Sequence, residues 1–414
     1  MNRPKRGDLA RHWILDSETC FLNHGSFGAT PVSVLEEQSR LRNLIESDPV
    51  RFFERDYIPL MKGAVGKLSD FINANPEGLV FVKNTTEGVN TVLRSLNLKP
   101  GDEIIVTNHS YQACWNAVDF VTERSDAKTV VVDIPFRVKN EGEVVDLIMD
   151  KITGKTVLAM IDTVTSATGL RMPFEKLVRD IQGVGVDVLL DAAHGPGIVP
   201  LDLIAMDAAY CTGNCHKWIC TPKGSAFLHI REDRKSLVRP LSISHGYSFE
   251  GTDQEKFEYE FGWPGTQDPT AWLCIPHAIE FLGSLLDGGW QEIMDHNRAL
   301  AIQGRRILCR ALGTSPPVPD SMVSSIAAVE MPGEGDVGPM SLEGDPYHNF
   351  LLDEFGIQVP VFPWRHHNKR YIRISAQLYN HVEEYEFLAD CLSKVSLIME
   401  SKPLNGGWRT QTHA

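Results

Sequence analysis

The chain has 414 residues, of which 43% are hydrophobic and 23% are charged, as in an ordinary folded protein with a large core. Its formal net charge is -14, which argues against a nucleic acid or an anionic membrane surface as a partner. No apolar run approaches the roughly 18 residues that a membrane span needs, so we expect no membrane segment.

The N-terminus and the cysteines favour a cytoplasmic protein. The basic N-terminus is not followed by an apolar run, as a secretory signal would be. Eight cysteines are spread along the chain, which is typical of free thiols in a reducing compartment. Cys211, Cys215 and Cys220 raise the alternative of a zinc site, but their spacing departs from the usual C-x₂-C pairs. We therefore predict buried thiols and no metal.

Seven short apolar runs are predicted to form buried strands. Most are rich in β-branched residues and do not alternate with polar ones, which is typical of parallel strands covered on both faces. The runs are residues 79–82, 103–107, 129–134, 156–161, 186–190, 208–211 and 225–230. Stretches with helical spacing, such as residues 89–96 and 147–152, lie between several of them. This alternation predicts an α/β fold with a mostly parallel seven-stranded sheet.

The pattern changes near residue 280. A long helix is predicted over residues 290–312, followed by a region rich in proline and glycine and a final α/β stretch. We therefore expect an N-terminal segment (residues 1–20), a large domain (21–285), a smaller C-terminal α/β domain (286–401) and a tail (402–414) that frays.

Polar residues gather directly after the predicted strands, where open α/β sheets bind their ligands. Thr85 and Thr86 follow the first strand at the start of a helix, where they could cradle a phosphate or simply cap the helix. His109 and Tyr111 follow the second strand. Either ring could lie against an aromatic ligand, or His109 could be an exposed residue at a capped helix start.

Two later loops supply a carboxylate and an amine. Asp191 follows the strand at 186–190, where a carboxylate is costly unless a group such as a pyridinium nitrogen faces it. The alternative is that Asp191 caps the next turn. Lys217 lies between His216 and Trp218 and could act as a Schiff-base amine with a lowered pKa, the alternative being a surface lysine. None of the alternatives explains the order of cradle, ring partner, carboxylate and amine.

Several motifs in the chain are those of a known family. They are Asp191-Ala-Ala-His194 with His216-Lys217, Arg373-Ile-Ser-Ala-Gln-Leu-Tyr-Asn380, Trp263-Pro-Gly-Thr-Gln-Asp268 and Asn23-His-Gly-Ser-Phe-Gly28. Over about residues 21–380, the chain resembles the fold-type I pyridoxal 5′-phosphate (PLP) enzymes of the class V aminotransferase group. Within that group it is most similar to isopenicillin N epimerases and cysteine desulfhydrase-like C–S lyases. The resemblance implies a PLP-dependent transferase fold of type I, a PLP-binding large domain and a homodimer.

The resemblance also implies roles for individual residues. Lys217 matches the lysine that carries PLP as a Schiff base, and Asp191 matches the acid that keeps the pyridine nitrogen protonated. His194 falls beside the ring hydroxyl, and Ser166 falls where some relatives carry an asparagine. His109 matches the residue that stacks on the ring, with Tyr111 as the alternative. The matched phosphate ligands are Thr85, Thr86, Asn214, His216 and, from the neighbouring subunit, Thr266.

The substrate end of the site follows from the same resemblance. Arg373 matches the arginine that binds the substrate α-carboxylate, a bidentate contact suited to a guanidinium. Asn23 and Arg55 are further candidates for substrate contacts. Cysteine desulfurases carry a cysteine shortly before this arginine, whereas here no cysteine lies between Cys309 and Cys391. A persulfide-forming desulfurase is therefore not expected.

We predict an enzyme that removes the Cα proton of an amino acid with Lys217 as the base. Among the possible outcomes we favour β-elimination from a cysteine-type substrate, with Tyr111 as the acid for the leaving group. Epimerisation, transamination and other biosynthetic reactions of the same family are the alternatives. A PLP-binding regulator with a DNA-binding helix-turn-helix is a rival from another class, but only about 20 residues precede the match and the chain is acidic.

Overall fold

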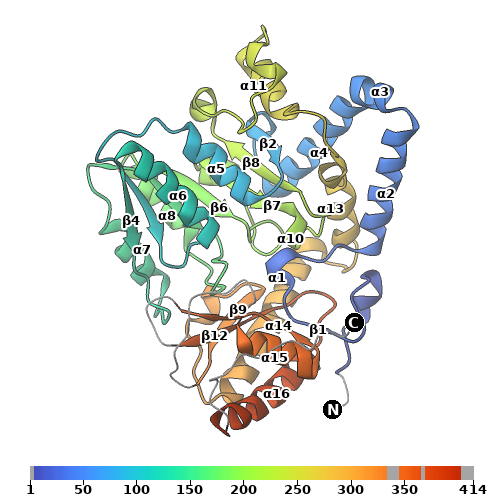
Figure 1. The fold of residues 1–414 in the computed structure, drawn as a ribbon, viewed down its shortest axis with the longest axis vertical. Helices are drawn as coiled ribbons and strands as arrows, with labels where there is room; N and C mark the ends of the chain where they lie inside the picture. The colour runs from blue at the N-terminus through green and yellow to red at the C-terminus, as the bar shows by residue number, and fades with distance from the viewer. Residues whose placement is uncertain (1–3, 333–344, 365–368, 402–414) are drawn as a thin grey trace, which may run out of the picture.

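A computed structural model describes residues 4–332, 345–364 and 369–401 of the chain. Its main feature is a seven-stranded sheet in the order β2-β8-β7-β6-β5-β3-β4, in the upper part of Figure 1. The strands are β2 (Leu79–Val82), β3 (Glu103–Thr107), β4 (Lys128–Val132), β5 (Thr156–Asp162), β6 (Asp187–Ala192), β7 (Tyr210–Asn214) and β8 (Ala226–Ile230). β8 runs antiparallel to β2 and β7, and the other neighbours are parallel. The predicted mostly parallel seven-stranded sheet is confirmed.

Helices cover both faces of this sheet because successive side chains of each strand enter opposite cores. In β3, Ile104 and Val106 pack with α5 and α6, whereas Ile105 packs on the other face with α4, α7, α8 and α13. The helices up to residue 95 are α1 (His24–Phe27), α2 (Val32–Ser47), α3 (Pro49–Arg51), the π-helical turn η2 (Phe52–Asp56), α4 (Tyr57–Ile72) and α5 (Thr85–Ser95). The helices that follow are α6 (Gln112–Ser125), α7 (Glu141–Met149), α8 (Phe174–Gly183), α9 (Leu203–Met206), α10 (Cys215–Trp218), α11 (Asp253–Gly262), α12 (Thr270–Leu273) and α13 (Ile275–Gly283).

A smaller antiparallel sheet of order β11-β12-β9 lies towards the C-terminus, in the lower part of Figure 1. Its strands are β9 (Ile326–Glu330), β11 (Val361–Pro363) and β12 (Arg370–Ser375), and its helices are α14 (Gly289–Ala311), α15 (Pro346–Phe355) and α16 (Val382–Ser401). These elements share a separate apolar core. β1 (Cys20–Phe21) pairs with β10 (Ile357–Gln358), which ties the N-terminal segment to this part of the chain. The domain boundaries stay predictions, and the tail 402–414 lies outside the described residues.

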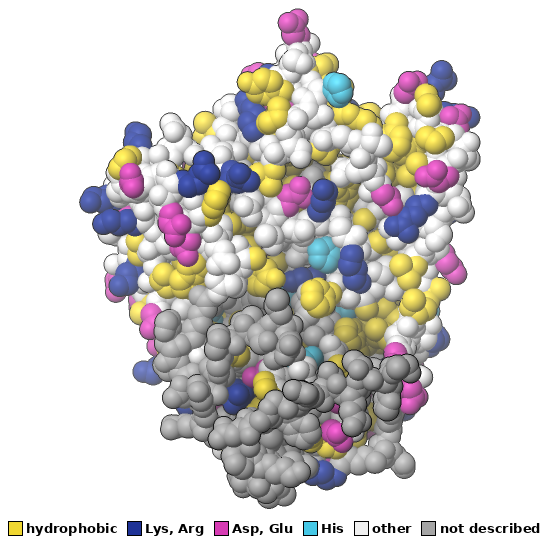
Figure 2. All heavy atoms as spheres, viewed as in Figure 1, with side chains coloured by type: hydrophobic (Ala, Val, Ile, Leu, Met, Phe, Trp, Pro, Cys, Tyr) yellow, Lys and Arg dark blue, Asp and Glu magenta, His cyan; other side chains and the backbone are white. Residues whose placement is uncertain are grey.

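In the upper part of Figure 2, basic, acidic and hydrophobic side chains are interspersed over the surface. All eight cysteines are buried and free. Within the described ranges, no group of three or more His, Cys, Asp or Glu side chains is arranged to hold a metal ion. No helix in these ranges has the length and apolar character needed to cross a membrane.

Candidate active site

Lys217 lies where β7 turns directly into the short helix α10. Its Nζ is 3.1 Å from Nε2 of His194, in the loop after β6. Burial, followed by the positive charge of Arg373, lowers the pKa of Lys217 to about 8. Such a lysine is partly neutral near physiological pH, so its amine can act as a nucleophile or a base. This environment differs from that of a solvated surface lysine.

Two carboxyl groups lie side by side at the end of the sheet. Asp162 of β5 and Asp191 of β6 are in register on adjacent parallel strands, and both are buried. Ser110 Oγ donates to Asp162 at 3.2 Å, and Cys114 Sγ contacts Asp191 at 3.4 Å. Burial raises the pKa of Asp191, and burial together with the charge of Asp191 raises that of Asp162 well above its usual range.

Oδ1 of Asp191 also accepts a hydrogen bond from the backbone N–H of Ala193 at 2.9 Å. Asp191 therefore caps the next turn, as the alternative predicted, but with only one of its two oxygens. The second acid, Asp162, was not predicted as a site residue. A signal was present in the sequence, because Asp162 ends its apolar run as Asp191 ends the next one.

The predicted phosphate cradle is formed by the start of α5 and the end of β7. Asn84 caps α5, accepting the N–H of Glu87 at 2.9 Å, so the alternative that Thr85 or Thr86 serves as the cap is wrong. The N–H of Thr85 instead donates to Oδ1 of Asn214 at 3.0 Å, which brings two predicted phosphate ligands together.

The sequence allows this approach because Gly88 has no side chain. A Cβ at Gly88 would lie 2.1 Å from Oγ1 of Thr212 on β7, so any larger residue would push α5 away from the sheet.

His216 lies beside the cradle, and one of its ring nitrogens already has a hydrogen-bond partner. Its Nδ1 donates to the carbonyl oxygen of Ser225 at 2.9 Å, which leaves Nε2 as the nitrogen available to a ligand. Burial and the charge of Lys217 lower the pKa of His216 to about 4. A bound phosphate would favour the cation, because only a protonated Nε2 can donate to a phosphate oxygen.

Arg373 of β12 enters the same region from the smaller sheet. It is 6% exposed and donates to the carbonyl oxygen of Ser166, to Oδ1 of Asn23 at 3.3 Å and to Oγ of Ser26 at 2.8 Å. All three acceptors are uncharged, and Nε has no partner among the described residues. Burial lowers the pKa of Arg373 to about 10.

Ser166 therefore contributes its carbonyl group to this arginine rather than its hydroxyl. Ser26 was missed in the sequence, although it lies one helical turn after Asn23. Residues 365–368 of the loop before Arg373 lie outside the described residues.

His109 and Tyr111 occupy different environments. His109 is buried, with Nδ1 2.7 Å from Oγ1 of Thr168 and Nε2 3.0 Å from the carbonyl oxygen of Ile134. Its ring meets the Trp364 ring edge-on at a centroid distance of 4.5 Å. The alternative of an exposed His109 is therefore wrong. Tyr111 is 48% exposed and interacts electrostatically with Arg373. The contact of either side chain with the cofactor ring stays a prediction.

Arg55 and Thr266 are the two predicted site residues that stand apart. Arg55 is exposed on η2, and Thr266 is exposed in the loop after α11. Within the described chain, neither has a hydrogen bond or ion pair to the residues around Lys217. An apolar cavity of about 720 Å³ lies between α4, α11 and β2, with Phe53 and Glu54 in its lining.

The arrangement fits PLP. Oγ1 of Thr85 is buried and has no hydrogen-bond partner among the described residues, which suits a phosphate in the cradle. Asp191 offers a buried carboxyl to a pyridine nitrogen, and the partly neutral amine of Lys217 suits an aldehyde. His194 is held beside that amine, where the resemblance places the ring hydroxyl.

Comparisons with known proteins agree with this geometry. The family described as aminotransferase class V matches residues 45–331. The chain is 30% identical to a putative L-cysteine desulfhydrase 1 of Oryza sativa subsp. japonica, covering 90% of this chain and 82% of that protein. It is also 30% identical to isopenicillin N epimerase of Amycolatopsis lactamdurans, covering 92% and 96%.

The solved structure of a cystine C–S lyase in complex with cysteine persulfide has a similar fold. Its TM-score is 0.75 at 19% identity, covering 91% of this chain and 98% of that one. The chain therefore belongs to the class V aminotransferase family of fold-type I PLP enzymes, as the sequence predicted.

Proposed function

We propose that this enzyme is a C–S lyase that eliminates the β-substituent of a cysteine-type amino acid. The observation that carries the proposal is Arg373, a buried guanidinium whose hydrogen-bond acceptors are all uncharged. A buried cation of this kind is costly until an anion pairs with it, and the planar α-carboxylate of an amino acid is a suitable partner. The relative named as a putative L-cysteine desulfhydrase supports a sulfur-containing substrate.

Each residue around Lys217 has its own role in the proposed elimination. Bound PLP supplies an electron sink that stabilises negative charge at the substrate Cα. Arg373 holds the α-carboxylate, and Asp191 holds a proton at the ring nitrogen. Lys217, with a pKa of about 8, accepts the Cα proton in its neutral form. Tyr111 donates a proton to the sulfur, which leaves with the electron pair of the C–S bond. The remaining 2-aminoacrylate hydrolyses to pyruvate and ammonia.

Epimerisation is the second candidate, because a relative is named isopenicillin N epimerase. Inversion needs a proton donor on the face of Cα opposite Lys217, whereas elimination needs one base and an acid at the leaving group. L-Cysteine, for which the putative desulfhydrase relative is named, carries a β-sulfur that can leave, and we therefore favour elimination. Transamination is a third alternative.

The experiment is a product assay on the purified PLP-loaded enzyme. L-Cysteine and S-substituted cysteines are supplied, and pyruvate, ammonia and the configuration of the remaining amino acid are measured. Equimolar pyruvate and ammonia from one substrate support the lyase. Inversion of configuration without pyruvate would instead assign the epimerase. Lys217→Ala is the control and should abolish either reaction.

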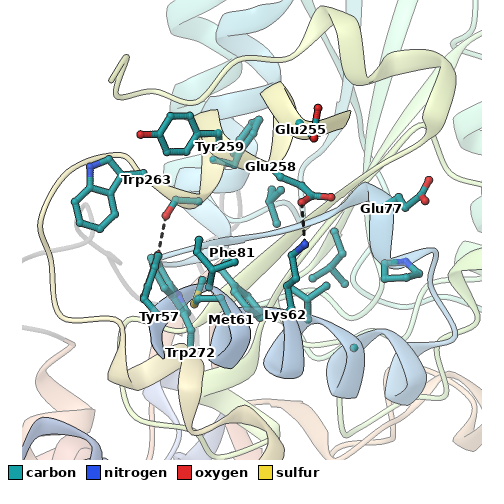
Figure 3. A pocket seen from close by; sticks show the side chains of 18 of the residues that line it. Tyr57, Met61, Lys62, Glu77, Phe81, Glu255, Glu258, Tyr259, Trp263 and Trp272 are labelled. Atoms are coloured by element: carbon teal, nitrogen blue, oxygen red, sulfur yellow. Dashed lines mark hydrogen bonds and ion pairs between the residues drawn. The ribbon is translucent and has the colours of Figure 1, made fainter. Parts of the chain in front are cut away.

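We also propose that the enzyme is a cytoplasmic homodimer in which Thr266 and Arg55 serve the partner's site. Both residues are exposed and stand apart from the cluster around Lys217. The cavity in Figure 3 is lined by apolar side chains that include Met61, Phe81 and Trp272, with the Lys62–Glu258 ion pair crossing it. Such an apolar hollow suits cover by a second copy. Eight free cysteines suit a reducing compartment.

Subunit mixing tests the shared site. Lys217→Ala and Thr266→Val homodimers should each be impaired. A mixed dimer then regains one intact site, with Lys217 from one subunit and Thr266 from the other. Recovery of activity on mixing supports the proposal. Full activity in a monomer, measured by sedimentation and turnover at the same concentration, would contradict it.

A further inference from the structure

His194 is held between two hydrogen-bonding groups in the interior. It is 1% exposed, and so is Trp218. Nε1 of Trp218 donates to Nδ1 of His194 at 3.2 Å. On the opposite side of the imidazole, Nζ of Lys217 lies 3.1 Å from Nε2. The imidazole thus connects an indole on one side to the amine on the other.

The direction of the first hydrogen bond determines the second. An indole nitrogen can only donate, so Nδ1 of His194 must present a lone pair and carry no proton. A neutral imidazole then carries its proton on Nε2. An imidazolium would point an N–H at the indole N–H, which opposes protonation. Burial, followed by the charge of Lys217, also lowers the pKa of His194 well below its usual value.

The Nε2–H of His194 therefore faces Nζ of Lys217. An ammonium group has three donors and no acceptor, so it meets this N–H unfavourably. A neutral amine has a lone pair and can accept the hydrogen bond. The contact is thus favourable for one protonation state of Lys217 only.

We propose that Trp218 is a positioning residue whose indole N–H fixes the tautomer of His194 and thereby favours the neutral form of Lys217. The proposal rests on the proposed function only in taking the PLP aldehyde as the target of Lys217. In that reaction the amine lone pair forms the bond to the aldehyde carbon, and the carbonyl oxygen leaves as water with both amine protons. An ammonium group must lose a proton before it can react.

Other charged groups also act on Lys217. The positive charge of Arg373 opposes the ammonium form, whereas Asp191 and Cys114 favour it. His24, whose Nε2 contacts the carbonyl oxygen of Lys217, and His216 both have lowered pKa values and are neutral. These effects do not depend on the indole N–H of Trp218. Replacing Trp218 therefore separates them from the effect of the hydrogen bonds that link Trp218, His194 and Lys217.

The test measures how fast PLP adds to the apoenzyme as a function of pH, from the absorbance of the product. In Trp218→Phe, His194 is free to bear its proton on Nδ1 and to accept from an ammonium. The pH midpoint of the rate should then rise by about one unit, and the rate at pH 7 should fall about tenfold. An unchanged midpoint in a folded Trp218→Phe protein would overturn the proposal.

Two further variants provide matched controls. In His194→Gln, the amide oxygen can accept from Trp218 while the amide NH₂ donates to Lys217, so the midpoint should stay near the wild-type value. Trp290→Phe removes an indole that donates to the carbonyl oxygen of Ile279 at 2.9 Å, and it should leave the midpoint unchanged. A large shift of the pH midpoint in His194→Gln would also contradict the proposal.

A spectrum of the wild-type apoenzyme covers the case in which Trp218→Phe fails to fold. Long-range ¹H–¹⁵N spectra of histidine-labelled protein report the tautomer of His194, whose signals are identified by their loss in His194→Gln. A proton on Nε2 is expected, and a proton on Nδ1 would overturn the proposal. This measurement contains no PLP. Failure of PLP to react with any variant at any pH would instead refute the proposed function.

Discussion

Replacing Gly28 by alanine should disturb Lys217 without changing any group in the site. Gly28 ends α1 with φ 70° and ψ 166°, a conformation that is almost restricted to glycine. A Cβ at this position would lie 2.2 Å from the carbonyl oxygen of His216 and 2.8 Å from Cα of Lys217. The substitution therefore strains the backbone of α1 and pushes α10 away at the same time.

The geometry sets the size of both effects. Backbone strain of this kind costs about 1–3 kcal/mol, which should appear as a lower free energy of unfolding. Non-bonded atoms prefer separations of about 3.5 Å, so α10 must shift by about 1 Å to accept the new methyl group. A misplacement of about 1 Å at a reacting group costs about 100-fold in rate. We expect turnover in Gly28→Ala to fall by about that factor.

Urea unfolding and steady-state turnover measure the two effects on the same preparations. Gly63→Ala is the matched control, because Gly63 lies within α4 and a Cβ there would meet no atom within 4 Å. In that helix interior, alanine should stabilise the protein by about 0.5–1 kcal/mol and leave turnover unchanged. If Gly28→Ala matched the wild type in both stability and turnover, close packing of α1 on α10 would not be what positions Lys217.

Three further predictions follow from the buried charges. Lys217→Met should stabilise the apoprotein at pH 7 by up to about 3 kcal/mol in urea unfolding, because the folded state lowers the pKa of Lys217 to about 8. The wild type should recover this stability as pH rises from about 8 to about 10.5, and a constant difference would contradict the assignment. Burial and the charge of Asp191 raise the pKa of Asp162, so the stability that its protonated form contributes is lost as pH rises through that pKa. Asp162→Asn should therefore be more stable than the wild type at pH 7, by a margin that shrinks towards pH 4, whereas a uniform loss would refute the buried-pair argument. Arg373→Lys should raise KM for the amino acid about tenfold or more, since a point charge cannot make the bidentate contact, and an unchanged KM would place the carboxylate elsewhere.

The local sequence determined the framework of this protein. Residues 79–82 and 103–107 coincide with β2 and β3, because short apolar, β-branched runs have few other ways to bury themselves. The local sequence also determined where the reactive side chains could lie. Asp191 and Lys217 each come at or just after the end of a strand, and the ends of parallel strands meet at one edge of a sheet. Their positions in the chain were therefore enough to predict that they lie together.

Tertiary structure decided which partner each polar group has. Asn84 rather than Thr85 caps α5, Asp162 stands in register with Asp191, and the indole of Trp218 donates to His194. The strand predicted over residues 208–211 instead runs from residue 210 to residue 214, because pairing with β6 and β8 carries polar residues into the sheet. A hydrogen bond requires both partners to be placed and oriented within a few tenths of an ångström. Groups far apart in sequence reach such positions only when the cores between them have packed.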